Sequence, residues 1–280
     1  MYIFICVITR IIQVKYNFLK QVILRLDFQG VLTSEMDNVL SPAKRLLKDK
    51  GFNRYEKRTE NEFEIQMGIH QGIPEAQAIS GAKPTEVHSF INETKGYAID
   101  LSSNHMCLKV NSTQYIPFEE YKEVFSGIAR IYQDNIDFFT ATRFGLRKIN
   151  FCFLNSLDQI TKYFNSSYFQ YHQLFSNTKN FTSERKETLQ VDDCKLNLLY
   201  GIEQGLLNQR KMYKITLDSD IYLDETRAIE GKILKCDGIS DLNEKLFEIY
   251  VDALSSEFIA LLSNENTNWA EDIKGVEQNE

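Results

Sequence analysis

Two segments of the chain share nearly the same sequence pattern. Tyr97 to Asn104 read Tyr-Ala-Ile-Asp-Leu-Ser-Ser-Asn, and Tyr213 to Asp220 read Tyr-Lys-Ile-Thr-Leu-Asp-Ser-Asp. Each follows a Gly-Ile-x-Gln-Gly segment, at Gly68 to Gly72 and at Gly201 to Gly205. Other similar segments occur in the same order in both halves, which is typical of an internal duplication. A duplication requires both halves to form the same elements, although short alternating strands also resemble one another by chance.

The apolar spacing in each half predicts a strand, a short helix, further strands with hairpin turns, and a long closing helix. Ser41 with Pro42, and Ser156, are residue types that begin helices. The expected first strands are 22–28 and 146–154, the closing helices 118–139 and 239–262, and the polar turns 102–104 and 218–220. This order favours antiparallel pairing and an α+β fold of two pseudo-repeated lobes, each strand, helix, antiparallel strands and long helix.

The predicted domain organisation follows the two halves. Residues 15–143 are the first α+β repeat, and residues 144–263 are the second, which carries an aromatic insertion at 163–181 that the first repeat lacks. The apolar residues 1–14 are too short for a transmembrane helix, which needs about 20 residues. We interpret them as an extension from a misplaced start codon or as an additional strand. Residues 264–280 are a polar, acidic tail that we expect to fray.

Charge and cysteine content restrict the partners and the compartment. The formal net charge of −7 argues against a wide nucleic-acid surface, which needs clustered Lys and Arg. The five cysteines are odd in number and widely spaced, and no C-x-x-C pair occurs. They are typical of reduced thiols in a cytoplasmic protein. The sequence also lacks a P-loop, a dinucleotide fingerprint and a G-x-S-x-G elbow, so we expect no cofactor.

Three carboxylates near the end of the second half are the weak candidate for a metal site. Asp218, Asp220 and Asp224 follow one another closely, and carboxylates at alternate strand positions share a face on which they can bind one divalent cation. The corresponding residues of the first half are Ser102 and Asn104. Asp, Ser and Asn all stabilise turns through bonds from side chain to backbone. We therefore interpret residues 218–220 as a turn.

The insertion has the most unusual composition of the chain. Closely spaced aromatic residues alternate there with Gln, Asn and His, a mixture that suits a surface for a peptide or protein. Packing between the two lobes is the alternative use of the same aromatics. The candidate partner-binding residues are Tyr163, Phe164, Tyr168, Phe169, Tyr171 and His172.

Gly145-Leu146-Arg147-Lys148-Ile149-Asn150 resembles the Gly-Leu-Arg-Tyr-Ile-Asn signature of a sporadically distributed bacterial family of unknown function. Asn17 to Phe28, Leu217 to Asp220 and Leu246 to Phe258 are also similar to segments of that family. Lys148, Phe151 and Ser219 depart from its pattern. The resemblance implies no activity, cofactor or catalytic residue, and the scattered distribution of the family is associated with mobile or defence genes.

These features together predict a cytoplasmic protein-binding module rather than an enzyme. The order of strands followed by a helix resembles SecB-like export chaperones, which suggests by analogy a chaperone, antitoxin or phage-defence accessory role with the product of an adjacent gene as partner. The alternative is a metal-dependent hydrolase or nuclease that uses Asp218, Asp220 and Asp224. We expect no membrane partner, and the oligomeric state stays open.

Overall fold

The strands are long and antiparallel, and the helices lie in separate segments of the chain, so the fold is α+β. The computed structural model describes residues 18–61, 64–70, 73–79, 84–111, 116–171, 181–207, 210–235 and 237–263. The predicted extension 1–14 and the predicted tail 264–280 lie outside the described residues.

The chain forms two compact units. The N-terminal unit contains residues 24–144 and 225–234, and the C-terminal unit contains the described parts of 1–23, 145–224 and 235–280. Strands β1 (Leu19–Gln29) and β8 (Thr140–Leu154) each contribute a segment to both units. The division near residue 144 lies beside the predicted boundary, whereas the placement of residues 18–23 and 225–234 differs from the predicted lobes.

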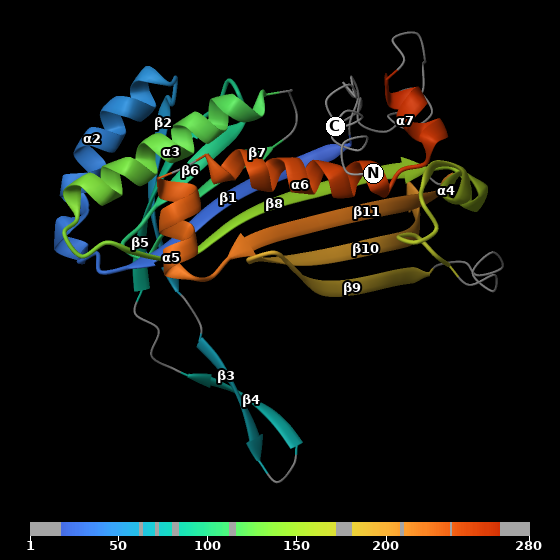
Figure 1. Ribbon diagram of the computed structural model, residues 1–280, viewed down its shortest axis with the longest axis horizontal. Helices are drawn as coiled ribbons and strands as arrows, with labels where there is room; N and C mark the ends of the chain where they lie inside the picture. The colour runs from blue at the N-terminus through green and yellow to red at the C-terminus, as the bar shows by residue number, and fades with distance from the viewer. Residues whose placement is uncertain are drawn as a thin grey trace. The chain divides into compact units, whose positions relative to one another are not determined.

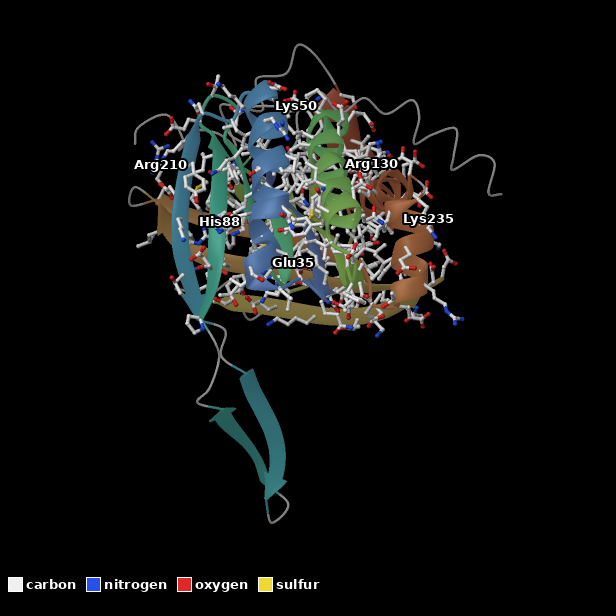
Figure 2. The ribbon with its side chains drawn as sticks, turned by 90° about the vertical axis from the view of Figure 1, so that its left-hand side faces the viewer. Glu35, Lys50, His88, Arg130, Arg210 and Lys235 are labelled. Carbon is white, nitrogen blue, oxygen red and sulfur yellow. The ribbon has the colours of Figure 1, made fainter. Side chains whose placement is uncertain are left out.

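The sheet of the N-terminal unit is covered by two helices on one face. Its strand order is β2 (Arg54–Asn61), β5 (Pro84–Asn92), β6 (Tyr97–Leu101), β7 (His105–Asn111), β1 and β8. Helices α2 (Met36–Asp49) and α3 (Phe118–Asn135) lie side by side over this sheet (Figures 1 and 2), and in Figure 2 Glu35 and Lys50 mark the two ends of α2. The shorter elements of the unit are η1 (Thr33–Glu35), α5 (Thr226–Ile229) and η3 (Glu230–Leu234).

A separate hairpin joins β2 to β5 in the sequence. Its strands β3 (Glu64–His70) and β4 (Ile73–Ile79) pair with each other in antiparallel register and form their own two-stranded sheet (Figure 1).

The sheet of the C-terminal unit has strand order β1, β8, β11 (Arg210–Leu223), β10 (Cys194–Leu207) and β9 (Thr182–Val191). Alternate residues of β10 and β11 are buried, and helix α6 (Gly238–Asp252) packs on β11. Helices α4 (Leu157–Tyr163) and α7 (Ser256–Ser263) pack against each other. β9 is the edge strand of this sheet among the described residues.

The closing helix predicted at 239–262 is two helices, α6 and α7. The chain leaves α6 at Asp252, where the Asn165 amide donates to the Asp252 carbonyl at 3.0 Å and the Asn165 backbone N–H donates to the Ala253 carbonyl at 3.0 Å. Ser255 then caps α7, since its hydroxyl accepts from the Phe258 N–H at 3.1 Å. The insertion thus supplies the bonds that end one helix, a long-range effect that apolar periodicity cannot reveal.

One predicted helix start is confirmed and the other is wrong. Ser156 caps α4, because its hydroxyl accepts from the Gln159 N–H at 3.4 Å while the Gln159 side chain accepts from the Ser156 N–H at 3.3 Å. Helix α2 begins at Met36, and Pro42 lies inside it. Its buried stripe starts upstream of the proline, so burial outweighs the backbone bond that Pro42 cannot donate.

The turn predicted at 102–104 is confirmed, and the turn predicted at 218–220 is wrong. Ser102 closes the first turn through its hydroxyl, which accepts from the His105 N–H at 3.1 Å. Residues 218–220 lie within β11 and pair continuously with Leu199, Leu198 and Asn197 of β10. The matched Tyr-x-Ile-x-Leu segments therefore occupy different places in the strand order, since another strand follows β6 before its closing helix and none follows β11. The duplication stays a prediction.

Candidate functional site

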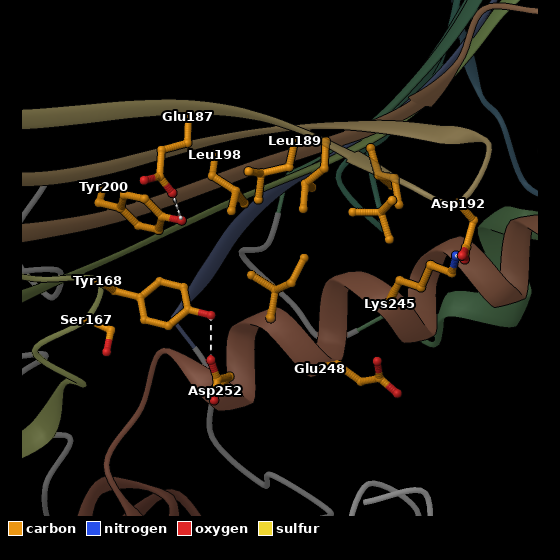
Figure 3. A pocket seen from close by; sticks show the side chains of 14 residues that line it. Ser167, Tyr168, Glu187, Leu189, Asp192, Leu198, Tyr200, Lys245, Glu248 and Asp252 are labelled. Carbon is orange, nitrogen blue, oxygen red and sulfur yellow. Dashed lines mark hydrogen bonds and ion pairs between the residues drawn. The ribbon is translucent and has the colours of Figure 1, made fainter. Parts of the chain in front are cut away.

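The C-terminal unit contains a groove between its edge strands and helix α6 (Figure 3). Its volume is about 620 Å³. Strands β9, β10 and β11 supply the floor, α6 supplies one wall, and two residues of the insertion close one end. The residues of this groove are Ser167, Tyr168, Glu187, Leu189, Val191, Asp192, Leu196, Leu198, Tyr200, Ile221, Lys245, Glu248, Ile249 and Asp252.

The floor of the groove is apolar because alternate strand residues face α6. The register places Leu189 of β9 opposite Leu196 of β10, and Leu196 opposite Ile221 of β11. Leu196 and Ile221 are buried, but Leu189 is 43% exposed, one of the few large apolar side chains with such exposure among the described residues. The apolar surface is thus continuous from the core to the edge of the sheet.

Two tyrosines form the aromatic end of the groove. The rings of Tyr168 and Tyr200 meet edge to face with their centres 5.2 Å apart. The Tyr168 hydroxyl donates to Asp252 Oδ2 at 2.6 Å, and the Tyr200 hydroxyl donates to Glu187 Oε2 at 3.2 Å (Figure 3). Burial and the neighbouring carboxylates raise the pKa of both phenols, so both hydroxyls remain protonated donors.

Arg185 braces this end from outside the groove. Its guanidinium lies over the Tyr200 ring at 5.9 Å from the centre and donates to the Ser167 carbonyl at 3.2 Å. The same guanidinium forms an ion pair with Glu187. These contacts hold the insertion against β9 and β10, and therefore fix the position of Tyr168.

The other end of the groove is charged. Lys245 of α6 bonds Asp192 at 2.6 Å, at the turn between β9 and β10, where Asp192 has a φ of 55° (Figure 3). Glu248 lies one turn further along α6 and is exposed. The lining residues together carry four carboxylates and one ammonium group, a net charge of −3. The groove therefore joins an apolar floor to an acidic rim.

The predicted partner-binding residues have different environments in the structure. Phe164 and Phe169 are each 3% exposed, which removes them from any contact surface. Their rings pack on each other, and the Phe164 ring also packs on Phe258 with centres 5.4 Å apart. Tyr163 stacks on the same Phe258 ring. The buried part of the insertion thus packs inside the C-terminal unit, whereas the alternative interpretation was packing between the two lobes.

The other residues of this prediction have different places. Tyr168 lines the groove. Tyr171 is half-buried, and its hydroxyl donates to the Leu157 carbonyl at 3.5 Å. His172 lies outside the described residues. Sequence reasoning missed the β9 and α6 residues of the groove, for which the signal was the apolar pair Leu189 and Val191 at the end of a largely polar segment.

The weak metal candidate is not assembled. Asp218 bonds the Arg147 guanidinium through both carboxylate oxygens, and Asp224 forms an ion pair with Lys195. Within the described ranges, no three His, Cys, Asp or Glu side chains gather in a geometry that could hold a metal ion. The buried thiols of Cys107 and Cys152 are not activated either, since burial raises the pKa of Cys107 to about 11 and that of Cys152 to about 12.

No protein-family model and no curated protein matches the chain. Among solved structures, the chain is weakly similar to the S. pombe Pct1 RNA triphosphatase in complex with the Spt5 CTD. The alignment covers 95% of this chain and 92% of that chain at 6% identity, with a TM-score of 0.16. A score this low does not establish a shared fold. In the described part of the chain, no helix is long and apolar enough to cross a membrane.

Proposed function

We propose that the protein is a cytoplasmic binding module that captures a protein partner in the groove of its C-terminal unit. The single observation that carries the proposal is the apolar floor that reaches the open edge of the sheet at Leu189, bounded by Tyr168 and Tyr200. Interfaces characteristically combine an apolar centre, aromatic anchors and a polar rim. A pocket for catalysis would instead need converging acid, base or nucleophilic groups.

The lining groups support binding better than chemistry. The two tyrosine hydroxyls are engaged by carboxylates and remain protonated, and Lys245 is engaged by Asp192. Among the described lining residues, none is a nucleophile activated by a neighbouring base. A chaperone, antitoxin or phage-defence accessory role is a special case of this proposal. The predicted pair of pseudo-repeated lobes is consistent with this proposal, because in the described residues the second lobe leaves part of β9 and β10 uncovered by helices.

Capture of the products of adjacent genes tests the proposal. The double variant Tyr168→Ala, Leu189→Lys removes an aromatic anchor and places a charge on the floor, so a captured partner should be lost. Leu206→Lys is the matched control, because Leu206 is 73% exposed in the same unit but does not line the groove. Retention of the partner by the double variant would place the interface elsewhere.

A further inference from the structure

The two units cover their sheets differently. In the N-terminal unit, α3 packs on β7 and places Tyr132 against Phe28 of β1, with ring centres 4.6 Å apart. Helix α2 packs beside α3 and extends to the edge strand, where the Lys44 ammonium lies over the Tyr55 ring of β2 at 5.2 Å. Two helices therefore cover this sheet out to its edge (Figure 2).

In the described part of the C-terminal unit, only the first of these two helices has a counterpart. Helix α6 packs on β11, as α3 packs on β7. The helix that follows the first strand of this half, α4, has 7 residues where α2 has 14, and it packs against α7 through the Lys162 to Glu257 ion pair. Among the described residues, no second helix lies beside α6, and the groove over β9 and β10 (Figure 3) occupies the place of such a helix.

The charge of the groove favours a ligand of opposite charge. Alongside the apolar floor, the lining residues carry a net charge of −3, which the guanidinium of Arg185 bonded to Glu187 reduces to −2. Glu248 is exposed on the rim, and the carboxylates of Glu187 and Asp252 accept hydrogen bonds from the two tyrosine hydroxyls. A segment with an apolar stripe and basic flanks is complementary to both parts of the groove.

We infer that the groove binds an amphipathic, basic helix of the partner protein, which packs beside α6 as α2 packs beside α3. This inference rests on the proposed function and deepens it. The wall from Lys245 to Asp252 is about 11 Å long at 1.5 Å per residue, so the contact takes about two helical turns. Apolar residues at i, i+3 or i+4, and i+7 face the floor, and Lys or Arg flank them.

The test uses the full-length protein and fluorescein-labelled peptides with the length of α2. The first peptide has leucines on one helical face and lysines on both flanks. The second has glutamates in place of the lysines, and the third has the composition of the first with a central proline that breaks the helix. Fluorescence anisotropy should show saturable binding of the first peptide alone, weakened by salt.

Two variants with matched controls locate the site. Glu248→Lys and Leu189→Ser should each weaken binding of the first peptide about tenfold, because one reverses a rim charge and the other removes floor area. Glu184→Lys makes the same charge change on β9 at a position that faces the opposite side of the sheet, and Leu206→Ser changes an exposed leucine outside the groove. Both controls should bind as the unchanged protein does.

The outcomes separate this inference from the proposed function. If the proline peptide binds as tightly as the first peptide and the groove variants weaken its binding equally, the bound segment is not a helix. The proposed binding function is then retained. Equal binding of the glutamate peptide overturns the charge selection. Peptide binding that neither groove variant changes overturns both proposals. Self-association that Glu248→Lys abolishes in sedimentation would identify a second copy of the chain as the occupant and overturn the partner helix.

Discussion

Arg147 of β8 and Asp218 of β11 form a two-bond ion pair across neighbouring strands, with Arg147 Nε donating to Asp218 Oδ1 at 2.8 Å. Three residues along β8, the Asn150 amide donates to the Leu217 carbonyl at 3.2 Å. The Gly-Leu-Arg-Lys-Ile-Asn and Leu-Asp-Ser-Asp segments, far apart in the sequence, therefore meet in the fold. Their polar residues bond the two strands to each other. Asp218, which the sequence suggested as a metal ligand, therefore has a structural role.

Breaking this ion pair should lower stability slightly, and Mg²⁺ or Mn²⁺ should stabilise neither the unchanged protein nor the variants. The Arg147 side chain is 45% exposed and that of Asp218 is 12% exposed, so we expect a coupling energy of about 1 kcal/mol or less. Urea unfolding of Arg147→Met, Asp218→Asn and the double variant measures it. The more exposed Lys195 to Asp224 pair is the control, with a smaller coupling expected. A thermal shift with Mg²⁺ or Mn²⁺ that Asp218→Asn abolishes would restore the metal hypothesis.

Local pattern was enough for elements whose own residues decide the structure. The strand at 22–28 was predictable because Val22, Leu24, Leu26 and Phe28 all face the core. The cap of α4 was predictable because Ser156 and Gln159 bond each other. In both cases the pattern that decides the structure lies within a few residues of sequence.

Elements that depend on distant partners were predicted wrongly or missed. Asp218 belongs to a turn-like tripeptide, but Arg147 stands 71 residues away and supports it within a strand. The groove depends on the position of β9 at the edge of its sheet and on the shortness of α4, so Leu189 is exposed for reasons that its neighbours in sequence do not show.

The burial of Lys148 predicts an unusual dependence of the free energy of unfolding on pH. It lies on the same face of β8 as the buried residues Leu146 and Asn150, and burial lowers its pKa to about 8. In the folded protein it releases its proton near pH 8, whereas in the unfolded chain it keeps the proton to about pH 10.4. The unfolded state therefore binds more protons between these values, and the free energy of unfolding should rise there by at most about 3 kcal/mol.

A matched variant isolates this contribution. Lys148→Met keeps the length of the side chain and removes the charge, so it should be more stable at pH 7 and should lack the rise above pH 8. Cys152 acts in the opposite direction, since burial raises its pKa to about 12 while the unfolded thiol ionises near 8.5. The quantity to measure is therefore the difference in the free energy of urea unfolding between the unchanged protein and Lys148→Met, because Cys152 contributes equally to both. A pH-independent difference would show that Lys148 stays charged in the folded state.

Asp100 predicts a loss of stability in acid. It is 4% exposed on β6, and although burial alone would raise its pKa, hydrogen bonds from Arg58 at 2.9 Å, Ser89 and Lys109 at 3.1 Å lower it below its usual range. Because the folded pKa lies below the unfolded value near 3.9, the stabilisation is present above about pH 4 and is lost as pH falls through the folded pKa.

Asp100→Asn should therefore unfold at lower urea and show a flatter profile below pH 4. Removal of one member of a buried charged network costs about 2 to 4 kcal/mol, reduced here by the partial exposure of Arg58. Glu123→Gln is the control, because the Glu123 side chain is 68% exposed in its pair with Lys50 and should have no measurable effect. Equal profiles for the two variants would contradict the role of the Asp100 network.

Gly30 should tolerate substitution less well than Gly51. Its φ is 88°, and a Cβ at this position would lie 1.9 Å from the backbone carbonyl oxygen of Phe138, which cannot move without shifting the chain before β8. Gly51 has nearly the same φ of 86°, but its Cβ would meet only the Asn92 side chain at 3.3 Å. Both alanine variants carry the left-handed strain of about 1 kcal/mol, and Gly30→Ala adds the backbone collision, for a total of roughly 3 kcal/mol or more. The difference between their urea midpoints measures the collision alone, and equal midpoints would show that residues 30 and 138 do not approach as closely as described.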